Sequence, residues 1–141
     1  MLILDAVEKS FQTPDGALPV LRGVSFSLGP GDTLALTGES GSGKSTLVHA
    51  VAGLELIDAG RITVFGHTVA DMTDGELTRL RCDRIGLFFH QFNLIPSLTA
   101  DENFAFQALL SGRHDSNWVA HLTRTLGLDD MGSRYPEQLS G

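Results

Sequence analysis

The sequence predicts an α/β protein with an antiparallel β arm at its N-terminus and a helical part at its C-terminus. Three observations lead to this fold class. A short apolar run at 33–37 leads into a glycine-rich loop and then into a helical pattern at 44–52, which gives the order strand, loop, helix. Residues 24–28 alternate strictly between apolar and polar, as in a strand with one buried face. After Pro96 only helical patterns occur, which marks a boundary between two parts of the chain.

The N-terminal arm is predicted from two strand-like segments that a turn separates. Residues 2–9 have β character, and 14–16 (Pro-Asp-Gly) have the composition of a turn. In the second segment Val24, Phe26 and Leu28 alternate with polar residues. These three side chains should therefore face a core.

The segments that follow the arm alternate between helix and strand. The helix at 44–52 should bury Leu47, Val48 and Val51, which share one face. A short strand is predicted at 61–65. The nearly all-apolar run 85–89 (IGLFF) has the pattern of a strand that is buried on both faces.

Two capping-box patterns predict further helices. Thr73 to Glu76 precedes a helix whose Leu77 and Leu80 share a face, and 99–102 precedes a helix at 103–110. A last helix is predicted at 117–126, ended by a glycine at 127. Its apolar residues at near-helical spacing should belong to the core of this part: Trp118, Val119, Leu122 and Leu126.

The glycine-rich loop fills every fixed position of the phosphate-binding pattern GxxxxGK[ST]. It consists of Gly38, Glu39, Ser40, Gly41, Ser42, Gly43, Lys44, Ser45 and Thr46. Glycines let the backbone N–H groups wrap a polyphosphate, a lysine in the position of Lys44 reaches the β- and γ-phosphates, and the Ser45 hydroxyl is placed to ligate Mg²⁺. The alternative is a flexible glycine-rich connector, but the flanking strand and helix patterns favour a nucleoside triphosphate site.

Composition narrows the class of protein. The chain has 141 residues, 42% of them hydrophobic, and a formal net charge of -7, which leaves no basic face for nucleic acid. Its apolar runs are shorter than a membrane span, and the N-terminus lacks the pattern of a signal peptide, so we expect a soluble cytoplasmic protein. The single cysteine, Cys82, cannot form an internal disulfide and is expected to be a buried or half-buried thiol.

Beyond the loop, two blocks extend the pattern over essentially the whole chain. They are IGLFFHQFNLIPSLTADEN at 85–103 and RYPEQLSG at 134–141, which ends on the first three letters of LSGGQ. With the loop, they make the chain resemble the ATP-binding subunit of an ABC transporter, most closely the type that serves lipoprotein release and macrolide export. The resemblance implies a P-loop NTPase core, with residues 1–95 as its N-terminal part and 96–141 as a partial helical subdomain.

The resemblance also implies roles for residues outside the loop. Phe11 stands where the family has an aromatic residue that stacks on adenine; the alternative is a core residue at the end of a strand. Ser140 and Gly141 begin the signature that contacts the γ-phosphate bound by the opposite subunit, and with only LSG present that contact is incomplete.

One position departs from the family. Where the family has a glutamine that senses the γ-phosphate and Mg²⁺, this chain has His90, followed by Gln91. Mg²⁺ prefers oxygen ligands, so we expect weakened sensing. Two alternatives stay open: Gln91 takes the role after a one-residue slip, or His90 acts through a water molecule.

The resemblance implies ATP and Mg²⁺ as ligands, and a transmembrane permease and a second ATP-binding subunit as partners, at the inner face of the plasma membrane. The chain stops at Gly141, and none of its carboxylates stands in a catalytic context. We therefore expect the C-terminal core strands and the catalytic groups to be absent, and this chain to support ATP binding only. The alternative is a non-hydrolysing fragment or regulatory remnant that binds nucleotide or permease. The FNLIP block and the LSG ending argue against a third class, the small-molecule kinases.

Overall fold

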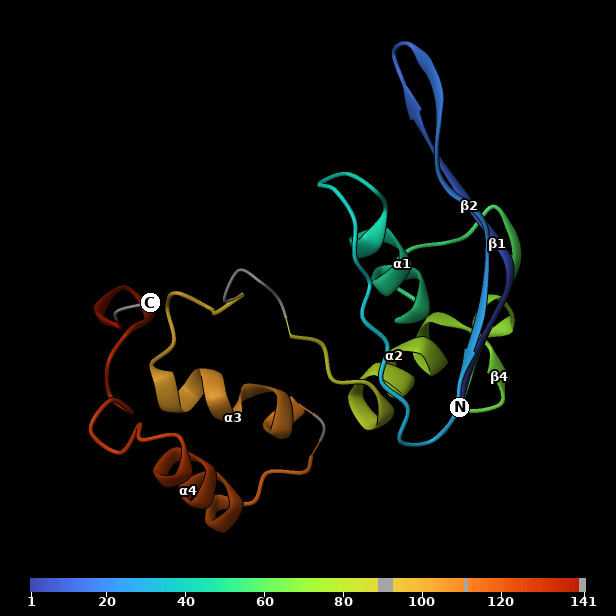
Figure 1. The fold of residues 1–141 in the computed structure, drawn as a ribbon. Coiled ribbons are helices and arrows are strands. Elements are labelled where there is room, and N and C mark those ends of the chain that lie inside the picture. Colours follow the sequence, from blue (N-terminus) through green and yellow to red (C-terminus); the bar gives the residue numbers. More distant parts are fainter. Residues whose placement is uncertain (89–92, 111, 140–141) are drawn as a thin grey trace. The chain divides into compact units, whose positions relative to one another are not determined.

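An antiparallel β-sheet forms the frame of the N-terminal part of the protein (Figure 1). The computed structural model of this chain describes residues 1–88, 93–110 and 112–139. The chain divides into two compact units, Met1–Ile85 and Gly86–Gly141. The first unit contains four strands in the order β2-β1-β3-β4. Their bounds are β1 Leu2–Thr13, β2 Gly16–Leu28, β3 Ala59–Val64 and β4 His67–Thr68.

The predicted arm is confirmed as a long hairpin of β1 and β2. Thr13 pairs with Gly16, so the turn consists of Pro14 and Asp15. Strand β3 pairs with β1 only from Leu2 to Glu8, and the rest of the hairpin extends beyond this part of the sheet (Figure 1). Near this extension the register of the hairpin shifts: its β1 residues 9 and 10 pair with β2 residues 21 and 19, which leaves Val20 as the extra residue of a bulge.

The core of the first unit lies between the sheet and two helices, α1 (Lys44–Val51) and α2 (Asp74–Arg84). Its most deeply buried large side chains are Val7, which is 0% exposed, and Ile62, which is 1% exposed. The predicted alternation in β2 is confirmed, because Val24, Phe26 and Leu28 are half-buried and the residues between them are exposed. Val24 and Phe26 pack against this core, whereas Leu28 is not among the residues that do. The helices contribute Leu47, Ala50, Leu77 and Leu80. Three side chains were predicted on the buried face of α1. The prediction is wrong for Val48, which is 41% exposed.

Helix α2 packs near the C-terminal end of α1, and its Arg81 bonds the two carbonyl groups that directly follow that helix. The Arg81 guanidinium donates hydrogen bonds to the carbonyl oxygens of Gly53, at 3.1 Å, and Ala52, at 3.4 Å. A cation at a helix C-terminus is favourable because the helix dipole is negative there. The predicted capping box at the start of α2 is confirmed, with Thr73 and Glu76 bonded to each other in both directions.

Two predicted strands are not strands in the structure. Residues 33–37 and 85–88 have no strand partner among the described residues, and residue 89 lies outside them. Leu34 and Leu36 are 45% and 38% exposed. An apolar, β-branched run suits a central parallel strand, but a strand forms only where a neighbouring strand accepts its backbone hydrogen bonds. Local sequence cannot supply that neighbour.

The second unit contains α3 (Ala100–Leu110), α4 (Ser116–Thr125) and a short 3-10 turn, η2 (Pro136–Gln138). The second predicted capping box is confirmed: the Thr99 backbone donates to Glu102 and the Glu102 backbone donates to Thr99 Oγ. The Asn103 side chain accepts from the backbone N–H of Ile95 and donates to three carbonyl groups of residues 95–99. This amide thereby folds the 95–99 segment onto the start of α3.

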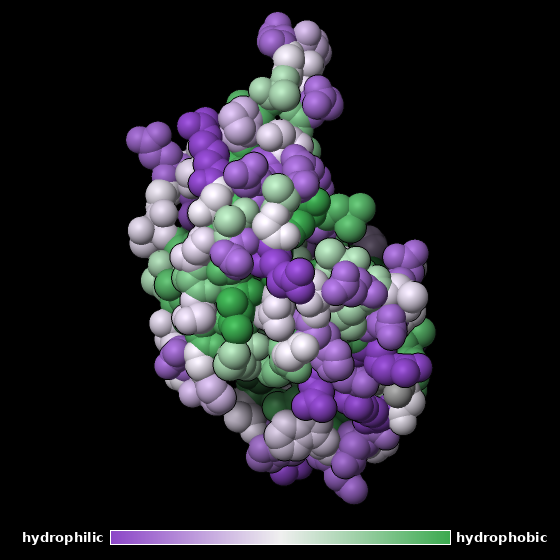
Figure 2. Space-filling view, turned by 90° about the vertical axis from the view of Figure 1, so that its right-hand side faces the viewer, coloured by the Kyte–Doolittle hydropathy of each residue, from purple (hydrophilic) through white to green (hydrophobic). Residues whose placement is uncertain are grey.

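Two expectations about burial are wrong. Trp118 and Leu126 are 56% and 59% exposed, so neither is a core residue of the second unit. Trp118 instead stacks on His121, with ring centroids 5.4 Å apart. Cys82 is exposed on α2. Hydrophobic side chains reach the surface among hydrophilic ones on the face that Figure 2 shows. Among the described residues, no helix is long and apolar enough to cross a membrane.

Candidate phosphate-binding site

The loop 38–46 leads directly into the N-terminus of α1. Gly43 is the N-cap residue, and the first helical residues are Lys44, Ser45 and Thr46. The first i→i−4 hydrogen bond of the helix runs from Leu47 N to Gly43 O, at 2.9 Å. The backbone N–H groups of the first helical residues therefore have no partner within the helix and point toward its positive end. This arrangement favours an anion in front of α1.

Glycines at three positions give the loop a shape that other residues would strain. The φ angles of Gly38, Gly41 and Gly43 are +144°, +82° and +89°. At Gly43 there is also no room for a side chain, because a Cβ atom would lie 2.8 Å from Val20 Cγ1 and 3.0 Å from the Val20 carbonyl oxygen. The end of the loop is thus packed against the bulge of β2. The hairpin and α1 together fix where the loop stands.

Lys44 closes the loop by binding its oxygen atoms. The ammonium donates to the carbonyl oxygens of Gly38, at 2.8 Å, and Glu39, at 2.6 Å, and to Ser42 Oγ, at 3.1 Å. A lysine ammonium has three donors and no acceptor, so all of its donors are engaged by the loop. The cation is therefore held within the ring of backbone that precedes α1. The positive charge of Lys44, the N–H groups of the glycine backbone and the N-terminus of α1 together fit a polyphosphate.

A cation at this site would depend on Ser45 and on the phosphate itself. The Ser45 residue is exposed at the start of α1, whereas Thr46 is half-buried. Among the described residues there is no group of three or more His, Cys, Asp or Glu side chains that could hold a metal ion. Mg²⁺ keeps several waters and is usually bound through one or two protein oxygens and substrate phosphates.

A cleft of about 340 Å³ lies beside the loop. It is lined by residues of β2 and by two loop residues: Leu18, Pro19, Val20, Arg22, Gly41 and Ser42. Its volume is within the range of small-molecule pockets. The cleft thus extends from the phosphate loop toward the outer part of the hairpin.

Phe11 lies on the side of the hairpin that carries the loop. Lys9 pairs with the buried Leu21, whose Cδ2 atom lies 3.3 Å from the Cβ position of Gly43. Paired residues of an antiparallel ladder point to the same side, and so do residues two apart on one strand. Phe11 therefore shares the side of Lys9 and Leu21, and its own partner is Leu18, which lines the cleft. Its side chain is 36% exposed, so it is not a core residue.

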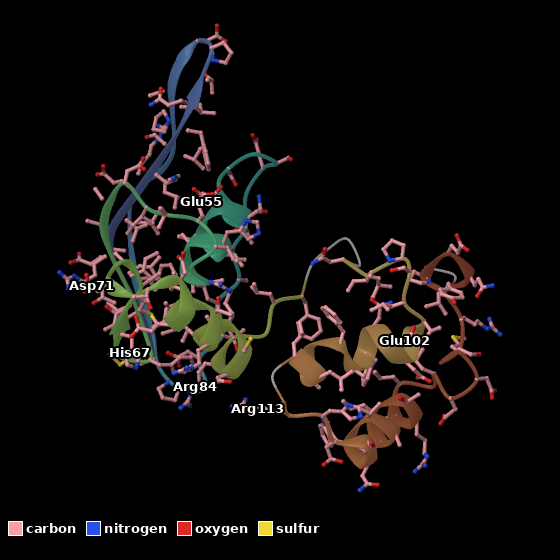
Figure 3. The ribbon with its side chains drawn as sticks, turned by 180° about the vertical axis from the view of Figure 1, so that it is seen from behind. Glu55, His67, Asp71, Arg84, Glu102 and Arg113 are labelled. Atoms are coloured by element: carbon pink, nitrogen blue, oxygen red, sulfur yellow. The ribbon has the colours of Figure 1, made fainter. Side chains whose placement is uncertain are left out.

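A larger cleft, of about 670 Å³, has none of the described site residues in its lining. It is formed by Met1, by residues near β3 and β4, and by α2; His67 and Arg84, labelled in Figure 3, are among its lining residues. Its lining contains no glycine of the kind that wraps a polyphosphate, so size alone does not make it the site. The predicted site residues His90, Gln91, Ser140 and Gly141 lie outside the described residues.

Comparison with known proteins shows to which family the chain belongs. The sequence pattern of the ABC transporter family matches residues 21–141. The chain belongs to the ABC transporter family. It is 42% identical over 145 residues to the lipoprotein-releasing system ATP-binding protein LolD of Maricaulis maris, and 37% identical over 144 residues to the macrolide export ATP-binding/permease protein MacB of Marinobacter nauticus. Both alignments cover 100% of this chain.

A solved structure shows the same fold. The ATP-binding cassette MJ0796, in a dimeric post-hydrolysis state bound to ADP and Pi, is 30% identical and superposes with a TM-score of 0.90 over 99% of this chain. The predicted fold class is thus confirmed as that of an ABC cassette. The chain spans 63% of the length of the LolD relative, 22% of MacB and 63% of the MJ0796 cassette.

The residues that surround Phe11 in this cassette were not predicted from the sequence. Lys9 and Glu55 form an ion pair of 2.8 Å, and the Lys9 ammonium stands 5.2 Å from the centroid of the Phe11 ring. The spacing of two residues between Lys9 and Phe11 on a predicted strand could have placed both on one side. No local signal connects either of them with Glu55, because the contact spans a hairpin, a loop and a helix.

Proposed function

We propose that this chain is the Mg-ATP-binding part of an ABC-type membrane exporter. The observation that carries the proposal is Lys44, whose ammonium is held by three oxygen atoms of the glycine loop at the N-terminus of α1. That arrangement presents a cation and backbone donors to a polyphosphate. The cleft beside the loop leads toward Phe11, on the side where a base would continue from the phosphates.

Each site residue has a role in this proposal. The backbone of residues 38–46 wraps the phosphates, with Lys44 as counter-ion and Ser45 as the protein ligand of Mg²⁺. Mg²⁺ would neutralise phosphate charge when bound. Phe11 stacks on the adenine ring. His90 or Gln91 senses the γ-phosphate, and Ser140 and Gly141 contact nucleotide on an opposite subunit.

The proposed partners are a second ATP-binding subunit and a transmembrane permease. Dimers of the MJ0796 cassette, and relatives named for lipoprotein release and macrolide export, support both. We place the protein in the cytoplasm, on the inner face of the plasma membrane, attached through the permease. The coupling of ATP binding and hydrolysis to transport belongs to this proposal.

Binding is tested by the stabilisation that nucleotide produces. A ligand present at about 100-fold its Kd adds about 2.7 kcal/mol to the free energy of unfolding. We expect Mg-ATP to raise the melting temperature of the unmodified protein and to have little effect on Lys44→Ala. The control is Arg61→Ala, which removes one exposed positive charge from β3 and should leave the nucleotide-induced shift intact. An unmodified protein whose melting temperature does not respond to saturating Mg-ATP contradicts the proposal.

A non-hydrolysing binding module is the second candidate, because the contacts of Lys44 with the loop account for holding a polyphosphate and not for activating a water molecule. The rate of ATP hydrolysis distinguishes an ATPase from a binding module. ATP hydrolysis is measured for the unmodified protein and for Lys44→Ala, each with the permease. Faster hydrolysis by the unmodified protein supports the enzyme, and equal rates leave binding without catalysis.

A further inference from the structure

The ring of Phe11 is contacted by a cation, Lys9, that lies outside the glycine-rich phosphate-binding pattern at 38–46. Lys9 precedes Phe11 by two residues on β1, so both side chains lie on the same side of the hairpin. The ammonium of Lys9 stands over the ring, 5.2 Å from its centroid. This distance is within the range of a cation–π interaction, in which the negative face of the ring attracts the charge. One face of Phe11 is therefore occupied.

Lys9 is held in this place by two carboxylates from another part of the chain. Its Nζ atom lies 2.8 Å from Glu55 Oε1 and 3.6 Å from Asp58 Oδ1, and the lysine side chain is only 12% exposed. Glu55, labelled in Figure 3, follows α1, and Asp58 precedes β3. The hydrogen bond that Lys9 donates to Glu55, together with the charges of Glu55 and Asp58, keeps the pKa of Lys9 above its ordinary value, so the ammonium remains charged at neutral pH.

The segment that carries these carboxylates is itself tied to β1. Asp58 Oδ2 accepts a hydrogen bond of 2.6 Å from Ser10 N, and Asp58 N donates one of 2.8 Å to Glu8 O. These bonds fall on the two residues that flank Lys9. Carboxylates, lysine and aromatic ring are therefore built as one unit, with little freedom for the lysine to leave the ring.

We propose that Lys9 is a positioning residue for the base of the bound nucleotide: it covers one face of Phe11 and holds the ring so that the other face receives the base. This inference rests on the proposed function, because it assumes that Phe11 stacks on adenine. Phe11 lies on the outer part of the hairpin, beyond the last residue of β1 that pairs with β3, and is 36% exposed. A ring in such a place loses conformational freedom when a base stacks on it, unless another group already restricts it.

The contributions of the base and of the phosphates to binding can be measured separately. Lys9 acts through the Phe11 ring, so its removal should weaken ligands that carry a base and leave a bare polyphosphate unaffected. The matched variant is Lys9→Met, which keeps an unbranched apolar side chain of similar length and removes the charge. The two probes are Mg-ATP and Mg-tripolyphosphate, and their dissociation constants are measured by calorimetry on the whole protein.

We expect Lys9→Met to weaken Mg-ATP binding about two- to fivefold, the range of an exposed cation–π contact, and to leave tripolyphosphate binding unchanged. Phe11→Leu should weaken ATP binding in the same selective way. In the Phe11→Leu background the further change Lys9→Met should have no effect, because the ring through which Lys9 acts is gone. Glu55→Gln, which loosens the lysine and keeps its charge, should produce part of the same loss.

Three results would overturn the proposal. An equal loss of ATP and tripolyphosphate binding in Lys9→Met would show that Lys9 only supports the fold. A full effect of Lys9→Met in the Phe11→Leu background would show that it acts independently of the ring. If Phe11→Leu binds ATP as tightly as the unmodified protein, Phe11 does not bind the base, and that part of the proposed function is wrong too. The phosphate site is tested separately: loss of tripolyphosphate binding in Lys44→Ala would still support it.

Discussion

Replacing Gly43 by alanine should destabilise the protein far more than the same change at Gly41, although both glycines belong to the phosphate loop. Their φ angles are nearly equal, +89° and +82°. A Cβ atom at Gly43 would lie 2.8 Å from Val20 Cγ1 and 3.0 Å from the Val20 carbonyl oxygen, whereas a Cβ at Gly41 meets no atom within 4 Å. Comparing Gly41→Ala with Gly43→Ala therefore separates the cost of backbone strain from the cost of steric conflict.

The magnitudes follow from these two contributions. A non-glycine residue in the left-handed region costs roughly 1–2 kcal/mol, and this cost applies to both variants. Overpacking adds about 1–3 kcal/mol, and only at Gly43. We expect a loss of about 1–2 kcal/mol for Gly41→Ala and about 2–5 kcal/mol for Gly43→Ala.

The free energy of unfolding is measured by urea titration, followed by far-ultraviolet circular dichroism. A double variant, Val20→Ala with Gly43→Ala, removes the Cγ1 conflict but keeps the conflict with the backbone oxygen, so it should recover only part of the loss. If Gly41→Ala and Gly43→Ala lose the same free energy within about 0.5 kcal/mol, the packing of the loop against the β2 bulge does not determine its stability.

Three further predictions concern the first unit. Gly60→Ala should cost about 3 kcal/mol or more in unfolding free energy, because its Cβ would collide with the Ala6 carbonyl group, while Gly66→Ala, at a similar φ and in open space, should cost only the backbone strain; equal costs would refute this. Hydrogen bonds from the Thr73 backbone and hydroxyl keep the pKa of Glu76 below its ordinary value, so its contribution is present above about pH 4.5 and is lost as pH falls through the lowered pKa. The free energy of unfolding, measured from pH 6 to about pH 3, should therefore fall less steeply in Glu76→Gln than in the unmodified protein. The same pH dependence in both proteins would contradict a lowered pKa of Glu76. Cys82 is exposed, so it should react with a thiol reagent in the native protein at close to the rate of the urea-unfolded chain; protection until unfolding would show otherwise.

Elements that depend on neighbours in sequence were predicted well. The capping box from Thr73 to Glu76 involves groups three residues apart, and the turn at Pro14 and Asp15 is equally local. The loop 38–46 is also local, since its glycines and Lys44 interact within nine positions. Propensity and spacing contain the information for such contacts.

Elements that depend on distant partners were predicted poorly. Residues 33–37 have the composition of a strand but no strand partner in the described part of the chain. Periodicity assigned Val48 and Trp118 to buried faces, and both are exposed. Which side of a helix is covered depends on the surface that packs against it, and one sequence window does not contain that surface.

The glycine-rich loop of this ABC cassette could be read from the sequence alone, because the contacts that close it, from Lys44 to residues 38, 39 and 42, lie within a few positions. The surroundings of the loop depend on the tertiary fold. The bulge at Val20 places the hairpin against Gly43, and the ion pair between Lys9 and Glu55 joins β1 to a segment more than forty positions away. Such contacts follow from the path of the backbone through space, so they became visible only when the fold brought these segments together.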